Sequence, residues 1–120
     1  MQVIEVPTLK GNTPARVNRK TGTIFLNMSI FKDLPDIYKK FILYHEECHF
    51  IFQTQDEEMC DEYAMHKLLR AGEKPKKIVD VLIKTLSDNN LHYARKINLT
   101  NNMRIYDYLY NGNKNALKSL

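Results

Sequence analysis

The stretch His45-Glu46-Glu47-Cys48-His49 lies within a nearly apolar segment and follows an H-E-x-x-H pattern. In an α-helix, residues four positions apart share one face, so His45 and His49 can offer two imidazoles to a single metal ion. Glu46 lies one position round the helix and can reach a water molecule held by that metal. Zinc accepts imidazole and carboxylate ligands and lowers the pKa of bound water, and a nearby carboxylate can then take the proton. The motif therefore predicts a Zn²⁺ site with His45 and His49 as ligands and Glu46 as general base.

The residues around the motif predict a buried helix. Asp33-Leu34-Pro35-Asp36 is a helix start, because proline suits the first turn and acidic residues there interact favourably with the helix dipole. Residues 37–52 are apolar on nearly every face apart from the motif and Lys39-Lys40. A helix of this composition is expected at the centre of its domain. The simpler alternative is that the two histidines are core residues with satisfied hydrogen bonds, since polar groups in such a helix must be paired or metal-bound.

A second helix is expected from Glu57 to Gly72, because glycine is a common helix stop. At 100° per residue, one face of it carries Glu57, Cys60, Asp61, Ala64 and Leu68. That face should pack on the motif helix and bring Glu57 and Asp61 beside the two histidines. His66 points the opposite way, and Glu58 and Glu62 are interpreted as solvated charges.

Together the two motifs resemble the gluzincin metallopeptidases, in which H-E-x-x-H is followed by Glu-x-x-x-Asp. The run Glu57-x-x-Cys60-Asp61-x-Tyr63-Ala64 is similar to the E-x-x-A-[DN]-x-F-A pattern of phage-associated ImmA/IrrE-like peptidases and of minigluzincins. The resemblance covers roughly residues 15–72. It implies that Glu57 is the third zinc ligand, that Asp61 orients a ligand histidine, and that the domain is zincin-like.

Two features depart from that resemblance. Only seven residues separate His49 from Glu57, so the turn between the helices must be tight. Cys60 stands where alanine is usual, and Cys48 lies inside the first motif. Both cysteines are interpreted as small core residues, with a soft metal ligand or an oxidisable thiol as the alternative.

Composition places the chain among single-domain globular proteins. Its 120 residues are expected to form one domain over residues 1–110 and a flexible tail over residues 111–120. The N-terminus lacks a signal-peptide pattern, no apolar run has membrane-spanning length, and two cysteines predict reduced thiols, which together favour a cytoplasmic location without a membrane partner. Residues 73–120 carry nine Lys/Arg and four Asp/Glu. This basic excess is interpreted as a solvated surface rather than a nucleic-acid interface, because it contains no compact cluster beyond Lys74-Pro75-Lys76-Lys77.

The expected fold class is α+β, with a small antiparallel sheet of about three strands and four to five helices. Strands are predicted at residues 3–6, 15–17 and 23–28, with a hairpin connection at residues 18–22. Further helices are predicted from Lys74-Pro75, from Leu91 to Ile97, and after a cap at Thr100 or Asn101. In the resembling families, the edge strand of the sheet lies above the metal and pairs with an extended substrate peptide.

Hydrolysis of a peptide bond also needs a group that stabilises the oxyanion. The candidates are four side chains, each of which is more simply explained as structural: Tyr63, His92, Tyr93 and Arg95.

The leading hypothesis is a zinc-dependent metalloendopeptidase acting on a protein or peptide, which the resemblance links to phage or mobile-element regulation. The alternative is a catalytically inactive zinc-binding module that acts through protein contacts. In that module, Cys48 or Cys60 would close the fourth coordination position, whereas an enzyme keeps it open. The substrate and the oligomeric state are left open by the sequence.

Overall fold

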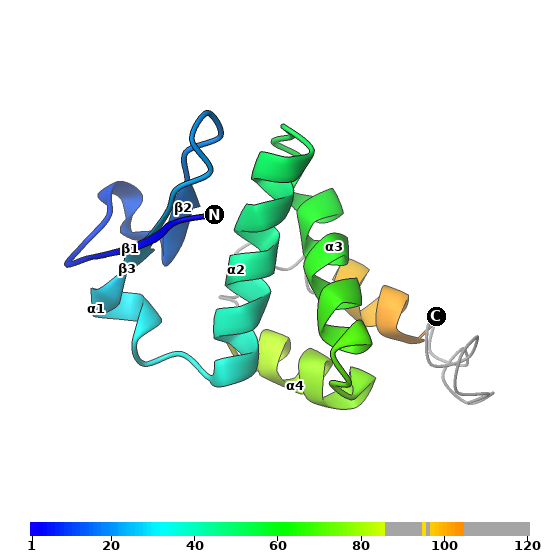
Figure 1. The fold of residues 1–120 in the computed structure, drawn as a ribbon. Helices are drawn as coiled ribbons and strands as arrows, with labels where there is room; N and C mark the ends of the chain where they lie inside the picture. The colour runs from blue at the N-terminus through cyan, green and yellow to red at the C-terminus, as the bar shows by residue number, and fades with distance from the viewer. Residues whose placement is uncertain (86–94, 96, 105–120) are drawn as a thin grey trace.

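The computed structural model describes residues 1–85, 95 and 97–104. Helix α2 lies between a three-stranded sheet and helix α3 (Figure 1). The strands are β1 (Val3–Val6), β2 (Ala15–Val17) and β3 (Ile24–Asn27); the helices are α1 (Met28–Phe31), α2 (Asp36–Ile51), α3 (Glu57–Arg70), α4 (Pro75–Thr85) and residues 97–104, with a 3₁₀ turn at Lys10–Asn12. The predicted α+β class, the three strands and the central H-E-x-x-H helix are confirmed.

The sheet is mixed, so the expectation of a wholly antiparallel sheet was wrong in one pairing. The strand order is β1-β3-β2, in which β2 and β3 form the predicted antiparallel hairpin. Strand β3 lies between the other two, and β1 pairs with it in parallel, starting from Val3 opposite Ile24. This order leaves β2 at an edge of the sheet, on the side where it packs against α2.

The hairpin between β2 and β3 is attached to the C-terminal part of α2. Gly22 has a φ of 77°, and its backbone N–H donates to the carbonyl oxygen of Asn18 at 2.8 Å. A Cβ atom at Gly22 would lie 2.9 Å from the ring of Phe50 on α2. The side-chain amide of Gln53 also donates to the Arg19 carbonyl at 2.8 Å. These contacts fix the position of β2 relative to the motif helix.

A tight turn joins α2 to α3, as the short spacing predicted. Gln53 has a φ of 49°, which is the left-handed conformation common just after a helix end. Asp56 caps α3, because its side chain accepts a hydrogen bond from the Met59 backbone N–H at 3.1 Å. Glu57 is therefore the first residue of α3, directly opposite the last turns of α2.

Residues 97–104 form a helix that packs on α3. Leu99 and Met103 are buried in the main core. The prediction that Thr100 or Asn101 caps the start of this helix was wrong, because both positions lie inside it. Leu99, one position earlier, is already helical and is buried in the core. The predictions for residues 91–94 and for a flexible tail at 111–120 fall outside the described residues.

No helix in the described ranges is both long enough and apolar enough to cross a membrane.

The attachment of the hairpin predicts a difference between two glycine substitutions. Gly11 (φ 79°) and Gly22 (φ 77°) have similar backbones, but a Cβ at Gly11 would meet nothing within 4 Å. Gly11→Ala should cost the left-handed strain alone, about 1–2 kcal/mol. Gly22→Ala should cost more, because the methyl group must also displace the ring of Phe50. Urea unfolding of both variants in the presence of a chelator measures this, and equal losses of stability would contradict the proposed anchoring role of Phe50.

Candidate metal centre

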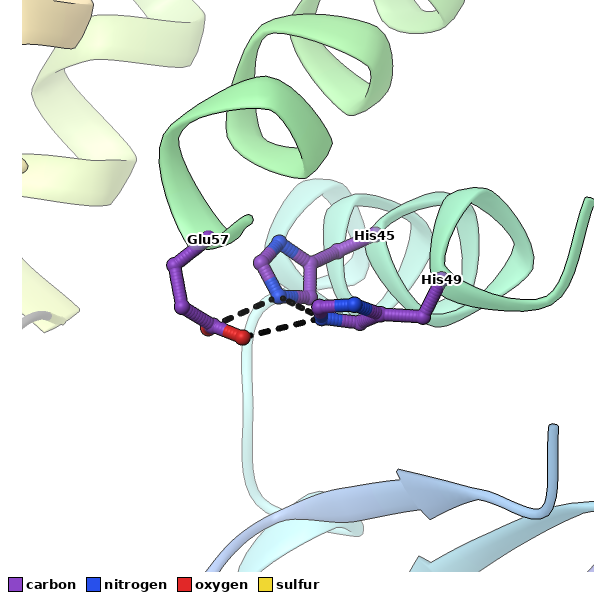
Figure 2. A group of neighbouring side chains, drawn as sticks. All are labelled: His45, His49 and Glu57. Atoms are coloured by element: carbon purple, nitrogen blue, oxygen red, sulfur yellow. Dashed lines mark hydrogen bonds and ion pairs between the residues drawn. The ribbon is translucent and has the colours of Figure 1, made fainter. Parts of the chain in front are cut away.

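The side chains of His45, His49 and Glu57 converge where α2 faces the start of α3 (Figure 2). The Nε2 atoms of the two histidines lie 3.1 Å apart. The Glu57 carboxylate reaches both rings, with Oε2 3.1 Å from Nε2 of His45 and Oε1 2.9 Å from Nε2 of His49. The helical phase that placed Glu57 on the inner face of α3 is therefore confirmed.

These three residues form a group that could hold a metal ion. One donor atom from each lies within 4.8 Å of the others, and both histidines are buried whereas the Glu57 side chain is 50% exposed. Two imidazole nitrogens and a carboxylate oxygen directed at one point are a donor set that divalent transition metals accept. The partly exposed carboxylate leaves one side of the group accessible from solvent.

The outer nitrogen of each imidazole has an acceptor beside it. Nδ1 of His49 donates to the carbonyl oxygen of Thr54 in the α2–α3 turn, at 2.7 Å. Nδ1 of His45 lies 2.8 Å from Oδ1 of Asp61, an ion-pair contact whose alignment is poorer than that of a full hydrogen bond. Acceptors at Nδ1 favour the tautomer in which Nε2 carries the free lone pair, as metal ligation requires. Asp61 therefore lies where an orienting residue for His45 is needed.

Asp61 is itself held by a second partner. Its side chain is 1% exposed, and both of its oxygens accept hydrogen bonds from the Arg95 guanidinium, from Nε and from Nη2, each at 2.7 Å. Burial on its own would raise the pKa of Asp61, but the contacts with His45 and Arg95 outweigh burial and hold that pKa below its usual value. Asp61 is thus a buried carboxylate that is paired on both sides.

The two carboxylates also determine the charge of His45. Burial would lower the pKa of His45, but the contacts with Asp61 and Glu57 raise it to about 9. The contact with His45 in turn lowers the pKa of Glu57, against the opposing effect of burial. Without a metal ion, a proton therefore provides the positive charge between these carboxylates, and a metal ion that binds at neutral pH would have to replace it.

Glu46 lies beside this group, in the wall between α2 and the sheet. Burial raises the pKa of Glu46, while His45 and His49 nearby lower it. A half-buried carboxylate with a raised pKa is a stronger base than one in water. Glu46 lines the same cavities as His45, His49 and Glu57.

Two cavities meet beside Glu46 and run along strand β2. One has a volume of about 160 Å³ and extends towards an apolar floor that includes Phe41 and Ile42. The other has a volume of about 450 Å³ and extends past Thr54 and the exposed side chain of Arg16. Ala15 and Glu46 line both cavities. An extended chain lying in these cavities would run beside an edge strand and pass the carboxylate of Glu46.

The segment before β2 is held over the site by Asn27, a residue for which the sequence predicted no role. Asn27 is fully buried, and its side-chain amide donates to the Thr13 carbonyl at 3.0 Å. Its backbone N–H donates to the Pro14 carbonyl at 2.9 Å. Its side-chain oxygen also caps α1 by accepting from the Ser29 backbone N–H at 3.2 Å. One buried amide therefore joins the end of β3 to the wall of both cavities.

Cys48 and Cys60 are free thiols at the interface of α2 and α3, and both are fully buried. Burial raises the pKa of each thiol, which favours the neutral form. In the described part of the chain, the donor group that could hold a metal contains neither cysteine. The interpretation of both as core residues is confirmed, and a thiolate in the fourth coordination position is not supported.

The oxyanion candidates have other partners or lie outside the described residues. The Tyr63 hydroxyl donates to Glu47 at 3.0 Å, on a different face of α2 from the two histidines. Arg95 binds Asp61, and His92 and Tyr93 are not among the described residues. The sequence identified Arg95 as a candidate but could not identify its partner. Similarly, no sequence signal marked the Thr54 carbonyl as the acceptor for His49.

Comparison with protein-family models, with curated proteins and with solved structures finds no match to this chain. The interpretation of this region as a metal centre therefore rests on the geometry and chemistry of its own residues.

The convergence of three ligands predicts a binding stoichiometry. The purified protein should bind about one divalent ion per chain, and His45→Ala or His49→Ala should abolish this binding because each removes one of three donors. His66→Ala is the matched control, since His66 is exposed on α3 and outside the donor group. Titration with Zn²⁺ and Co²⁺ followed by elemental analysis measures the stoichiometry. Absence of binding by the wild-type protein would refute the metal centre.

Two adjacent carboxylates on α3 provide a sharper comparison. Loss of an outer hydrogen-bond partner of a metal ligand weakens metal binding by roughly 10–100-fold. Glu57→Ala should weaken it by more than that, because the substitution removes a direct ligand. Glu58→Ala should leave the affinity nearly unchanged, since Glu58 is exposed and is not part of the donor group. Competition with a chromophoric chelator measures both affinities, and equal weakening by the two substitutions would contradict the assignment of Glu57.

Proposed function

We propose that this protein is a zinc-dependent metalloendopeptidase in which His45, His49 and Glu57 hold the metal and Glu46 is the general base. The observation that carries the proposal is the convergence of two buried imidazoles and one partly exposed carboxylate on a single point. Glu46 lies next to that point, in the wall shared by two cavities. A site that only stabilises the fold has no need for an additional base or for an accessible side.

The residues of the chain suit hydrolysis of an extended peptide. A bound zinc ion would supply a Lewis acid that makes water nucleophilic at neutral pH. Glu46 would take the proton from the attacking water and return it to the leaving amine, which a carboxylate with a raised pKa does well. Strand β2 has a free edge beside both cavities and could hold the substrate backbone by β-augmentation.

The resemblance to gluzincins extends this proposal. It covers residues 15–72 and suggests a peptidase similar to phage-associated ImmA/IrrE-like enzymes and minigluzincins, with a regulatory protein as substrate. A reducing, cytoplasmic setting is part of the same proposal, supported by two cysteines that are both free. The alternative of an inactive zinc-binding module is less well supported, because neither cysteine belongs to the donor group.

The proposal predicts a specific loss of activity for one glutamate in the motif. Glu46→Gln keeps the shape of the side chain and should keep metal binding, but it should reduce peptide hydrolysis by about 10²–10⁴-fold because the amide cannot take the proton. Glu47→Gln is the matched control, since Glu47 interacts with Tyr63 and Lys67 away from the metal ligands. Cleavage of a peptide library measured by mass spectrometry tests this, and equal activity of Glu46→Gln and wild type would refute the base assignment.

A further inference from the structure

Arg95 lies outside the segment that resembles known metallopeptidases, yet it contacts the metal centre. It follows Asp61 by 34 residues in the sequence, and its side chain is 15% exposed. It lines the smaller cavity together with His45 and Glu57. The roles proposed for the metal ligands and the general base do not explain why a mostly buried guanidinium lies at this position.

The Arg95–Asp61 contact is bidentate and its geometry is rigid. Nε donates to Oδ2 and Nη2 donates to Oδ1, each at 2.7 Å, at the short end of the range for charge-assisted hydrogen bonds. A planar guanidinium that binds both oxygens fixes the plane and the rotamer of the carboxylate as well as its charge. Because Oδ1 of Asp61 also lies 2.8 Å from Nδ1 of His45, fixing this carboxylate also restrains the imidazole.

The helix that follows Arg95 is anchored to the core independently of the metal centre. Leu99 and Met103 are 2% and 3% exposed, respectively. The side-chain amides of Asn98 and Asn102 donate to the Glu62 carboxylate at 3.4 and 3.2 Å. Glu62 is adjacent to Asp61 on α3, so the same helix carries the anchoring acceptor and the partner of Arg95. The guanidinium is therefore placed by a packed helix next to it.

We propose that Arg95 is a positioning residue that acts through Asp61 to hold the His45 imidazole in the orientation needed to bind a metal ion. The proposal rests on the metal centre of the proposed function, but not on peptide hydrolysis. Under this assignment, residues 15–72 alone do not complete the metal centre, because they lack Arg95. The part of the chain after α4 contributes the third member of a His45–Asp61–Arg95 series, in which each residue restrains the previous one.

A set of charge and shape variants tests the role of Arg95. Arg95→Met removes both the charge and the planar donor, and it should weaken Zn²⁺ binding by about 10–100-fold, the usual cost of losing an outer partner of a metal ligand. Arg95→Lys keeps the charge but loses the fork, so it should still weaken binding, by a smaller factor. Arg70→Met is the matched control, because Arg70 is exposed at the end of α3. It should leave the affinity within about twofold of wild type, the scatter expected of surface substitutions.

A double-mutant cycle separates positioning through Asp61 from general stabilisation. Asp61→Asn should weaken Zn²⁺ binding, and adding Arg95→Met to it should have little further effect, since the residue through which Arg95 acts is already altered. Urea unfolding of the metal-free proteins reports stability separately. The absorption spectrum of bound Co²⁺ reports the ligand geometry, and it should change in Arg95→Met and Arg95→Lys but not in Arg70→Met.

Three outcomes would overturn the assignment: an unchanged Zn²⁺ affinity in Arg95→Met, an unchanged affinity in Arg95→Lys, or an equal loss on Arg95→Met with and without Asp61→Asn. If Arg95→Met does not fold, the same comparison is made with Arg95→Lys, alone and together with Asp61→Asn. Wild-type protein that binds Zn²⁺ but cleaves no peptide would refute the proposed function and leave this test intact. An unchanged affinity in the Arg95 variants would refute only the role of Arg95.

Discussion

The contact between the two motif histidines and the acidic residues of α3 constrains the whole domain. His45, His49 and Asp61 are buried between α2 and α3, and burying such groups is costly unless each one is paired. In the observed register of α3 against α2, Glu57 reaches both Nε2 atoms while Asp61 reaches the other side of His45. The turn between the helices supports this register, since the Thr54 carbonyl accepts from His49 within it. Packing and candidate chemistry therefore impose the same arrangement on α2 and α3.

Much of this site was predictable because it depends on local periodicity. The i, i+4 spacing of His45 and His49 and the helical phase of Glu57 and Asp61 need only regular helices and a short connection. The features that could not be predicted depend on contacts between distant residues. The parallel pairing of β1 with β3 depends on which strand is inserted between two others, and hydrophobic pattern alone does not determine that order. The roles of Asn27 and Arg95 likewise appear only when segments 14 and 34 residues away are in place.

The differing burial of the three donor residues leaves one side of the group open to solvent. The histidines are held by α2 on the inner side, whereas half of the Glu57 side chain is exposed. The free side of the group is lined by Ala15 of strand β2 and by Glu46. Strand β2 has no neighbouring strand on its outer edge, and its Val17 backbone bonds to the Glu46 carboxylate beside the donor group. The edge position of β2 is therefore the feature on which the proposed binding of an extended chain depends.

The restraints on this site come from distant parts of the described chain. Asn27 holds the segment before β2, the contact of Phe50 with Gly22 holds the hairpin, and the Arg95 guanidinium holds Asp61. Metal sites need ligands fixed to within a few tenths of an ångström, and outer partners provide much of that precision. Helices α2 and α3 alone would leave the Asp61 carboxylate beside His45 without its Arg95 partner. Because the restraint on that ring extends through Asp61 to a helix beyond α4, the affinity of the centre for metal should depend on the packing of Leu99 and Met103 as well as on the ligands themselves.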